Sequence, residues 1–198
     1  LDDLEEKRKK DSVVTGVPSG LLDLDELTSG FQKGELVIIA GRPSMGKTAL
    51  ALSMIRNAAL EADMGIGMFS LEMGNQSLAM RLLCAEARVN MHFVRTGKLP
   101  SKLWKNLGLA AGELEEAPIY LDDTPAITVR ELRAKTRRLV SKNKIDMIVV
   151  DYLQLMQGPR GIENRQQEIS VISRSLKALA KEINVPIVAL SQLSRAVE

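Results

Sequence analysis

Cysteine, histidine and aromatic residues are scarce in this sequence of 198 residues. Cys84 is the single cysteine and so cannot form a disulfide within the chain, and the single histidine, His92, has no cysteine or histidine partners at metal-ligand spacing. The sequence therefore disfavours a disulfide-stapled fold and a structural zinc site. Aromatic residues make up 3% of the chain, which leaves few side chains on which the bases of a single strand could stack.

Long apolar runs are also absent. No stretch reaches the roughly 18 residues of a membrane span and no signal peptide is visible, so we expect a cytoplasmic protein without a membrane partner. The net charge of +2 and the pI near 8.7 are too mild to indicate a polyanionic partner. In contrast, 45% hydrophobic residues are enough for the core of one large domain or two small ones.

Apolar, strand-like runs alternate with segments of helical periodicity. The runs lie at 35–40, 65–70, 118–123, 146–153 and 185–192. Two of the segments between them, 128–142 and 163–184, carry apolar stripes typical of amphipathic helices. Buried strands that alternate with such helices predict an α/β fold, with a mostly parallel sheet flanked by helices on both faces.

A phosphate-binding loop is the clearest motif. The residues "GRPSMGKT" at 41–48 match G-x-x-x-x-G-K-T, between the apolar strand "ELVIIA" and a predicted helix that begins at Thr48. Successive N–H groups of such a loop point at phosphate oxygens, Lys47 reaches the β and γ phosphates, and Thr48 offers its hydroxyl to Mg²⁺. We expect the nucleotide to contact Gly41, Arg42, Pro43, Ser44, Met45, Gly46, Lys47, Thr48 and Ala49.

An acid for the metal should follow another buried strand. In "DMIVVDYLQL" four apolar residues are followed by Asp151, which can hold Mg²⁺ through a water molecule. An acid after an apolar strand is weak evidence by itself. Combined with the phosphate loop it becomes strong evidence for a magnesium site, because the two elements must converge on one ion.

Hydrolysis also needs a group that takes a proton from the attacking water. The residue after Asp151 is Tyr152, so the base must come from another strand end. Glu72 in "MFSLEM" and the pair Asp122 and Asp123 are the candidates. We favour Glu72, because its strand follows the phosphate-loop helix and consecutive strands of a β-α-β unit are commonly neighbours or near neighbours. Gln192, at the end of the last strand, is a candidate sensor of the γ-phosphate.

The segments "TGVPSGLLDLDELTSGFQKGELVIIAGRPSMGKTALAL", "FSLEM", "IVVDYLQLM", "ENRQQEIS" and "VPIVALSQLSR" closely resemble the ATPase domain of DnaB-type bacterial replicative helicases. The resemblance implies a RecA-like fold over residues 15–198, incomplete at its C-terminus, after an interdomain linker tail at 1–14. It implies Mg²⁺ and ATP as cofactors, Glu72 as catalytic base, and Gln192 as sensor. It further implies a ring-shaped homohexamer on single-stranded DNA at the replication fork, with a primase and a helicase loader as partners.

DNA contacts are harder to assign. The basic residues between Arg130 and Lys144 are best interpreted as a solvated helix face, whereas Arg160 and Arg165, in a Gly-rich polar segment, are better candidates. Two other functions remain open. A recombination or repair ATPase of the same fold would exchange strands without unwinding, and a nucleotide-binding assembly module would bind ATP without DNA-stimulated turnover.

Overall fold

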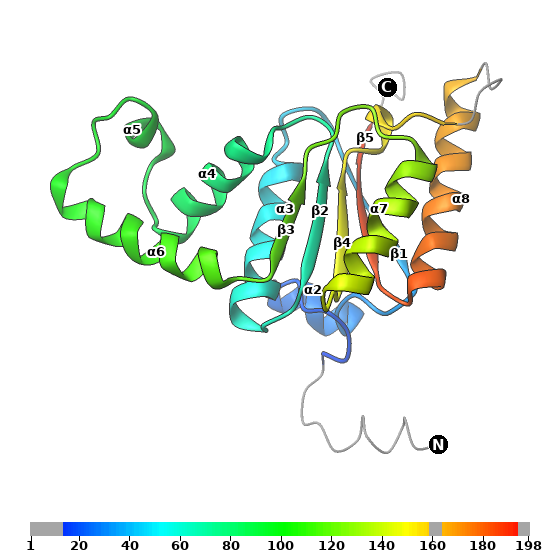
Figure 1. Ribbon diagram of the computed structural model, residues 1–198, viewed down its shortest axis with the longest axis horizontal. Coiled ribbons are helices and arrows are strands. Elements are labelled where there is room, and N and C mark those ends of the chain that lie inside the picture. The colour runs from blue at the N-terminus through cyan, green and yellow to red at the C-terminus, as the bar shows by residue number, and fades with distance from the viewer. Residues whose placement is uncertain (1–13, 159–163, 194–198) are drawn as a thin grey trace.

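The computed structural model describes residues 14–158 and 164–193 of the chain (Figure 1). The linker tail predicted at 1–14 therefore lies outside the described residues, apart from Val14. The strands are β1 (Leu36–Gly41), β2 (Ile66–Ser70), β3 (Ile119–Asp122), β4 (Met147–Asp151) and β5 (Ile187–Gln192). The helices are α2 (Leu22–Thr28), α3 (Lys47–Arg56), α4 (Asn75–Glu86), α5 (Met91–Arg95), α6 (Trp104–Glu116), α7 (Val129–Lys142) and α8 (Arg165–Ile183), with short helical turns at η1 (Asn57–Glu61), η2 (Ser101–Leu103) and η3 (Leu153–Leu155).

The strands form one sheet in the order β1-β5-β4-β2-β3, and every pairing is parallel. The predicted α/β fold is thus confirmed, and each predicted strand is present. All residues of β2 and β4 are buried, which explains why their sequences are apolar without alternation. Because the strands are parallel, all five carboxyl ends lie at the same edge of the sheet.

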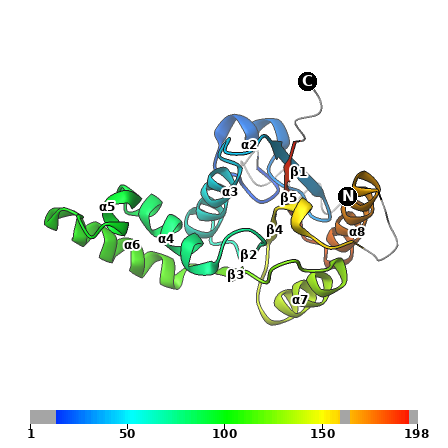
Figure 2. The ribbon, with the colours of Figure 1, turned by 90° about the horizontal axis from the view of Figure 1, so that it is seen from above.

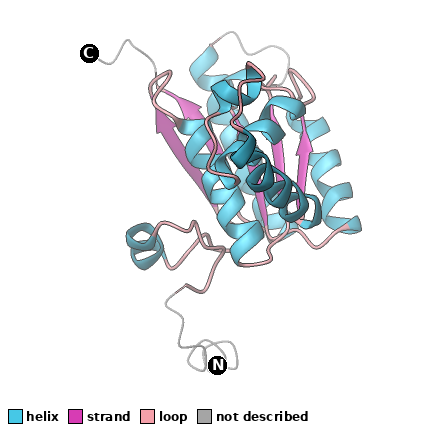
Figure 3. Ribbon diagram, turned by 90° about the vertical axis from the view of Figure 1, so that its left-hand side faces the viewer, coloured by secondary structure: helices cyan, strands magenta, loops and turns pink. Residues whose placement is uncertain are grey.

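Helices cover both faces of the sheet, and each face has its own core (Figure 2). On one face Leu52, Met54 and Ile55 of α3 pack against alternate residues of the central strands. On the other face α7 and α8 supply Leu132, Thr136, Ile172, Leu176 and Leu179, which are the centres of the two stripes predicted from periodicity. Figure 3 shows the resulting three layers, with the strands enclosed between helices.

The segment between β2 and β3 forms a small helical unit that the strand and helix pattern did not predict in detail. Helices α4, α5 and α6 extend beyond the edge strand β3 (Figure 1) and enclose a separate apolar cluster around Cys84, Val89, Leu99 and Ala110. Within the described parts of the chain, no helix is both long and apolar enough to cross a membrane.

The amino-terminal ends of β2 and β4 approach each other very closely at Gly65. A Cβ atom on Gly65 would lie 1.8 Å from the carbonyl oxygen of Lys144, and the main chain of Gly65 exchanges hydrogen bonds with Asp146. The backbone must therefore shift to accept any side chain at this position.

We expect Gly65→Ala to lower the free energy of unfolding by about 1–3 kcal/mol, because the clash is with main-chain atoms that cannot rotate away. Gly112→Ala is the matched control, since Gly112 lies on the exposed face of α6 with no atom within 4 Å of the added methyl group. It should raise stability by about 0.5–1 kcal/mol through helix propensity. Denaturant unfolding measures both, and equal effects of the two substitutions would contradict the close approach.

Candidate functional site

The loop between β1 and α3 has the backbone of a phosphate-binding loop. Ser44 and Gly46 adopt positive φ angles of 62° and 84°, and Gly46 precedes the first residue of α3. The N–H groups of this turn and of the helix start are thus oriented for an anion. Lys47 Nζ donates to the carbonyl oxygens of Gly41 and Arg42, at 3.0 Å each. These bonds hold the ammonium group over the loop.

Asp151, the last residue of β4, lies beside the first turn of α3. The hydroxyl of Thr48 donates to Asp151 Oδ2 at 2.7 Å, across the intervening strand β5. Asp151 is 1% exposed. Burial raises the pKa of this carboxyl, and the negative charge of Glu72 adds to the effect, while the bond from Thr48 and the charges of Lys47 and Arg81 oppose it. The predicted convergence of Thr48 and Asp151 is therefore present in the structure.

Glu72 lies just beyond the carboxyl end of β2, and the sheet register fixes its height. Ser70 pairs with Asp151 in the parallel ladder, and the N–H of Leu71 donates to the carbonyl oxygen of Asp151 at 2.7 Å. Glu72 therefore comes directly after a residue that is hydrogen-bonded to the end of β4, the strand that carries Asp151. Glu72 is exposed to solvent rather than buried.

The prediction that the strand of Glu72 lies beside or near the phosphate-loop strand is wrong. β2 is not a neighbour of β1, because β5 and β4 lie between them in the sheet. After β1 the chain continues through α3 and re-enters the sheet as β2, three positions away from β1. Glu72 faces the phosphate loop across β4 and β5, and local sequence order cannot reveal such a strand insertion.

The alternative bases have other roles in the fold. Asp122 accepts a hydrogen bond from Lys135 at 2.6 Å, and although burial acts in the opposite direction, the contacts with Lys135 and Thr124 keep the pKa of Asp122 below its ordinary value. Asp123 accepts from the main-chain N–H of Asn75, at the start of α4. Both residues belong to the edge strand β3 or its end, on the far side of β2 from the phosphate loop.

One cavity of about 350 Å³ unites the predicted residues. Its walls are formed by the phosphate loop and the first turn of α3, by Glu72, Met73 and Arg81, and by Asp151, Tyr152 and Gln192. Of the predicted loop contacts, Gly41, Arg42 and Met45 do not line it. Gly41 and Arg42 instead bind Lys47 through their carbonyl oxygens, and the side chain of Met45 is exposed.

Arg81 is a member of the site that sequence reasoning missed. It lies on α4, nine positions after Glu72, and looks in the sequence like an ordinary charged residue of a helix surface. In the structure its Nε is buried without a hydrogen-bond partner among the described residues, and its charge acts on Asp151. An unpaired buried guanidinium N–H beside a phosphate loop is a donor available to an anionic ligand.

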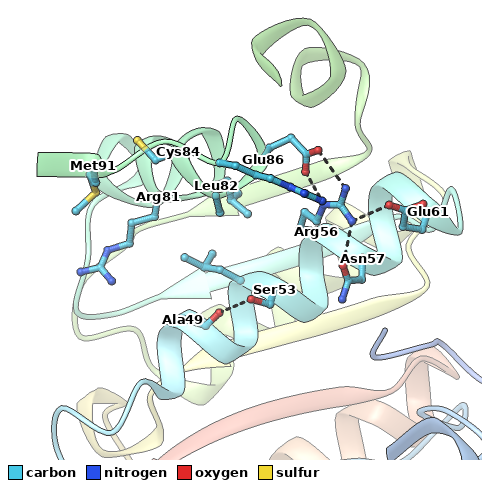
Figure 4. A pocket seen from close by; sticks show the side chains of 13 residues that line it. Ala49, Ser53, Arg56, Asn57, Glu61, Arg81, Leu82, Cys84, Glu86 and Met91 are labelled. Atoms are coloured by element: carbon cyan, nitrogen blue, oxygen red, sulfur yellow. Dashed lines mark hydrogen bonds and ion pairs between the residues drawn. The ribbon is translucent and has the colours of Figure 1, made fainter. Parts of the chain in front are cut away.

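A second cavity of about 520 Å³ lies between α3 and α4, and Arg81 also lines it (Figure 4). Three of the other charged residues around it are paired with one another, because Arg56 binds Glu86 on α4 and Glu61 on η1. Figure 4 shows the side chain of Arg81 directed away from this cluster. The paired charges make the second cavity a structural junction of α3 with α4 rather than a reactive centre.

The candidate DNA contacts differ in what the structure says of them. Arg160 lies outside the described residues. Arg165 begins α8, where it pairs with Glu168 and donates to the carbonyl oxygen of Gln154. On α7, Arg133 and Arg137 both pair with Glu182 of α8, and Lys135 pairs with Asp122. Much of the basic stretch thus connects elements within the fold.

The residues present fit a magnesium ion and a nucleotide. Mg²⁺ prefers oxygen ligands, and the Thr48 hydroxyl and the Asp151 carboxylate supply two oxygens that already touch. A cation beside Asp151 would favour its ionised form and offset the burial that raises its pKa. A Cβ atom added to Gly46 would meet no atom within 4 Å, and this open space leaves room for phosphate oxygens against the loop N–H groups.

Comparisons with known proteins identify the family of the chain. The family described as DnaB-like helicase C terminal domain matches residues 16–198. The chain is 54% identical to the replicative DNA helicase DnaB of Geobacillus stearothermophilus and 50% identical to the replicative DNA helicase DnaC of Bacillus subtilis (strain 168). Each alignment covers 100% of this chain and 44% of the relative. The chain therefore spans less than half the length of these relatives.

Solved structures show the same relationship. A DnaB-like replicative helicase, solved in a study of its interactions with primase, superposes with a TM-score of 0.90 at 37% identity, covering 99% of this chain and 48% of that one. A second solved structure, described as an ATPase domain, gives 0.92 at 37% identity, covering 99% and 70%. A KaiC-like protein of Pyrococcus horikoshii OT3, 21% identical with a TM-score of 0.61 over 91% and 73% of the two chains, shares the RecA-like fold. With this match of family, fold and phosphate loop, the chain belongs to the DnaB-like helicase C-terminal domain family.

Proposed function

We propose that this chain is the ATPase motor domain of a replicative DNA helicase, which couples hydrolysis of Mg-ATP to translocation on single-stranded DNA and duplex unwinding. The observation that carries the proposal is the single cavity that gathers Lys47, Thr48, Glu72, Asp151 and Gln192 from four different strand ends. The relatives named as replicative helicases support unwinding over strand exchange. A full set of hydrolytic groups argues against an assembly module without turnover.

Each group has a role that follows from its position. Lys47 exchanges its bonds with loop carbonyls for the β and γ phosphates, and Thr48 and Asp151 are the residues that would hold a magnesium ion. When bound, the ion would neutralise charge on the phosphate oxygens. Glu72 takes a proton from the attacking water as the water oxygen bonds to the γ-phosphorus, and the bond from that phosphorus to the bridging oxygen breaks with ADP as the leaving group. Gln192 hydrogen-bonds the γ-phosphate, and Arg81 contributes a further positive charge on the Glu72 side.

The assembly and partners are part of the same proposal. We infer a ring-shaped homohexamer with nucleotide at the subunit interfaces, acting at the bacterial replication fork in the cytoplasm. A primase is supported as partner by the related DnaB-like helicase, which was studied with primase, and a helicase loader is expected from the family. Arg160 and Arg165 remain our candidates for DNA contact. For Arg165 this requires exchanging its bonds to Glu168 and Gln154 for a DNA phosphate.

Lys47→Ala should abolish ATP turnover by the full-length protein, because the substitution removes the ammonium group that the loop carbonyls hold over the phosphate site. Lys33→Ala is the matched control: Lys33 is exposed and precedes β1, at the opposite edge of the sheet. A phosphate-release assay with and without single-stranded DNA measures both variants. Near-normal turnover by Lys47→Ala would refute the assignment of the phosphate loop.

Glu72→Gln should leave ATP binding intact and lower hydrolysis by roughly 10²-fold or more, because the amide keeps the size of the side chain but takes up no proton. Asp123→Asn, at the end of the next strand, should remain within a few-fold of the wild type. Binding is followed with a fluorescent ATP analogue and hydrolysis by phosphate release. The opposite ranking of these two variants would transfer the role of base to Asp123.

Asp151→Asn should eliminate turnover yet raise the thermal unfolding midpoint of the nucleotide-free protein at neutral pH. Burial raises the folded-state pKa of Asp151, so the wild type loses stability as pH rises from the unfolded-state pKa through the folded-state value. The neutral asparagine does not lose stability in this way as pH rises. Its higher unfolding midpoint, by about 2–4 °C for each kcal/mol of stability gained, should disappear on acidification. A variant less stable than the wild type at neutral pH would contradict a destabilising buried carboxylate.

A further inference from the structure

Gln154 makes an unusual contact with the last strand. β4 and β5 lie side by side, but their ladder ends where Val150 pairs with Ala189, while β5 continues to Gln192. Beyond this point the side-chain amide of Gln154, in the turn η3 that follows β4, occupies the place of a neighbouring strand. Its Nε2 donates to the carbonyl oxygen of Gln192 at 3.0 Å, and its Oε1 accepts from the N–H of Gln192 at 3.1 Å.

The two bonds together fix the main chain of Gln192 on one side. A third bond, from Gln154 Nε2 to the hydroxyl of Ser191 at 3.0 Å, extends the contact by one residue. On its other side Gln192 pairs with Gly41 in the ladder to β1, and the N–H of Leu193 donates to the carbonyl oxygen of Gly41 at 3.1 Å. The end of β5 is thus held between the phosphate-loop strand and a single side chain.

Gln154 itself is anchored from α8. Arg165 donates to the main-chain carbonyl oxygen of Gln154 and pairs with Glu168. Glu168 Oε1 accepts from the main-chain N–H of Gly158 at 2.7 Å. These contacts join the segment after β4 to the first turn of α8, and they restrain the backbone at Gln154 independently of its side chain.

We propose that Gln154 is a positioning residue, whose amide holds the main chain of Gln192 at the height where the Gln192 side chain meets the nucleotide. The inference rests on the proposed function for its catalytic consequence. Gln154 does not line the nucleotide cavity, whereas Gln192 does. Gln154 therefore acts on hydrolysis only through Gln192. Misplacing a group that contacts the reacting phosphate by about 1 Å can cost up to about 10² in rate.

The test uses the full-length protein with Gln154→Ala and Gln154→Met, the second of which keeps the length of the side chain and removes the amide. Gln157→Ala is the control, because Gln157 is exposed in the same turn region. The first readout is hydrogen exchange of the Gln192 main-chain amide, which does not depend on turnover. We expect it to accelerate by about 10-fold or more in both Gln154 variants and to remain unchanged in the control. Unchanged exchange in folded Gln154→Met would overturn the proposal.

The second readout is ATP turnover without DNA. Both Gln154 variants should lower kcat by about 10-fold while the KM for ATP stays near the wild-type value, since the phosphate loop is untouched. In a Gln192→Ala background, Gln154→Ala should cause no further loss, because the two residues act through one group. Independent, multiplicative losses, or faster exchange with unchanged kcat, would overturn the positioning role. A wild-type protein without turnover would instead refute the proposed function, and hydrogen exchange would still decide what Gln154 holds.

Discussion

The hydrogen bond from Thr48 to Asp151 depends on the way the whole sheet is ordered. Thr48 stands at the start of α3, after β1, whereas Asp151 ends β4, and β5 separates the two strands. The bond forms because parallel strands in this register end at one height: Gly41 pairs with Gln192, and Asp151 pairs with Ser70. The insertion of β5 and β4 between β1 and β2 sets the width of the cavity in which we propose that the nucleotide binds. Lys47, Thr48, Glu72, Asp151 and Gln192 lie along this one edge, whereas Arg81 lines the same cavity from α4.

Asp151 shows how function and stability oppose each other at this edge. A carboxylate that is 1% exposed, with one hydrogen bond from a hydroxyl, is costly to ionise, and its pKa is raised accordingly. The residue is tolerated because the two apolar cores on either face of the sheet hold β4 in place. A magnesium ion would remove the cost at the moment when the carboxylate is used. The burial of this acid is therefore consistent with the role of magnesium ligand that we propose for it.

Much of this arrangement could be predicted from the sequence, and the exceptions share a physical cause. The roles of Lys47, Thr48 and Asp151 can be predicted because the phosphate-loop motif and the apolar strands beside these residues are local features of the sequence. The burial of Leu132 and Leu176 can be predicted from the helical periodicity of apolar residues. The order of the strands is not local, so the sequence predicts for the strand of Glu72 a position near β1 that it does not have in the sheet. Arg81 acquires its importance from the electrostatic effect of its charge on Asp151, 70 positions away along the chain, and Gln154 from its hydrogen bonds with Gln192, 38 positions away. No window of sequence around either residue contains that information.

A structure of the full-length protein with Mg²⁺ and a transition-state mimic of ATP would test the central claim most directly, namely that this edge of the sheet is a hydrolytic nucleotide site. We expect the phosphates to accept hydrogen bonds from the loop N–H groups and the ion to lie near Thr48 and Asp151. The water molecule opposite the leaving group should lie within hydrogen-bond reach of Glu72. The amide of Gln192 should contact the γ-phosphate mimic. A nucleotide bound elsewhere, or a water held by Asp122 or Asp123 instead, would contradict the account.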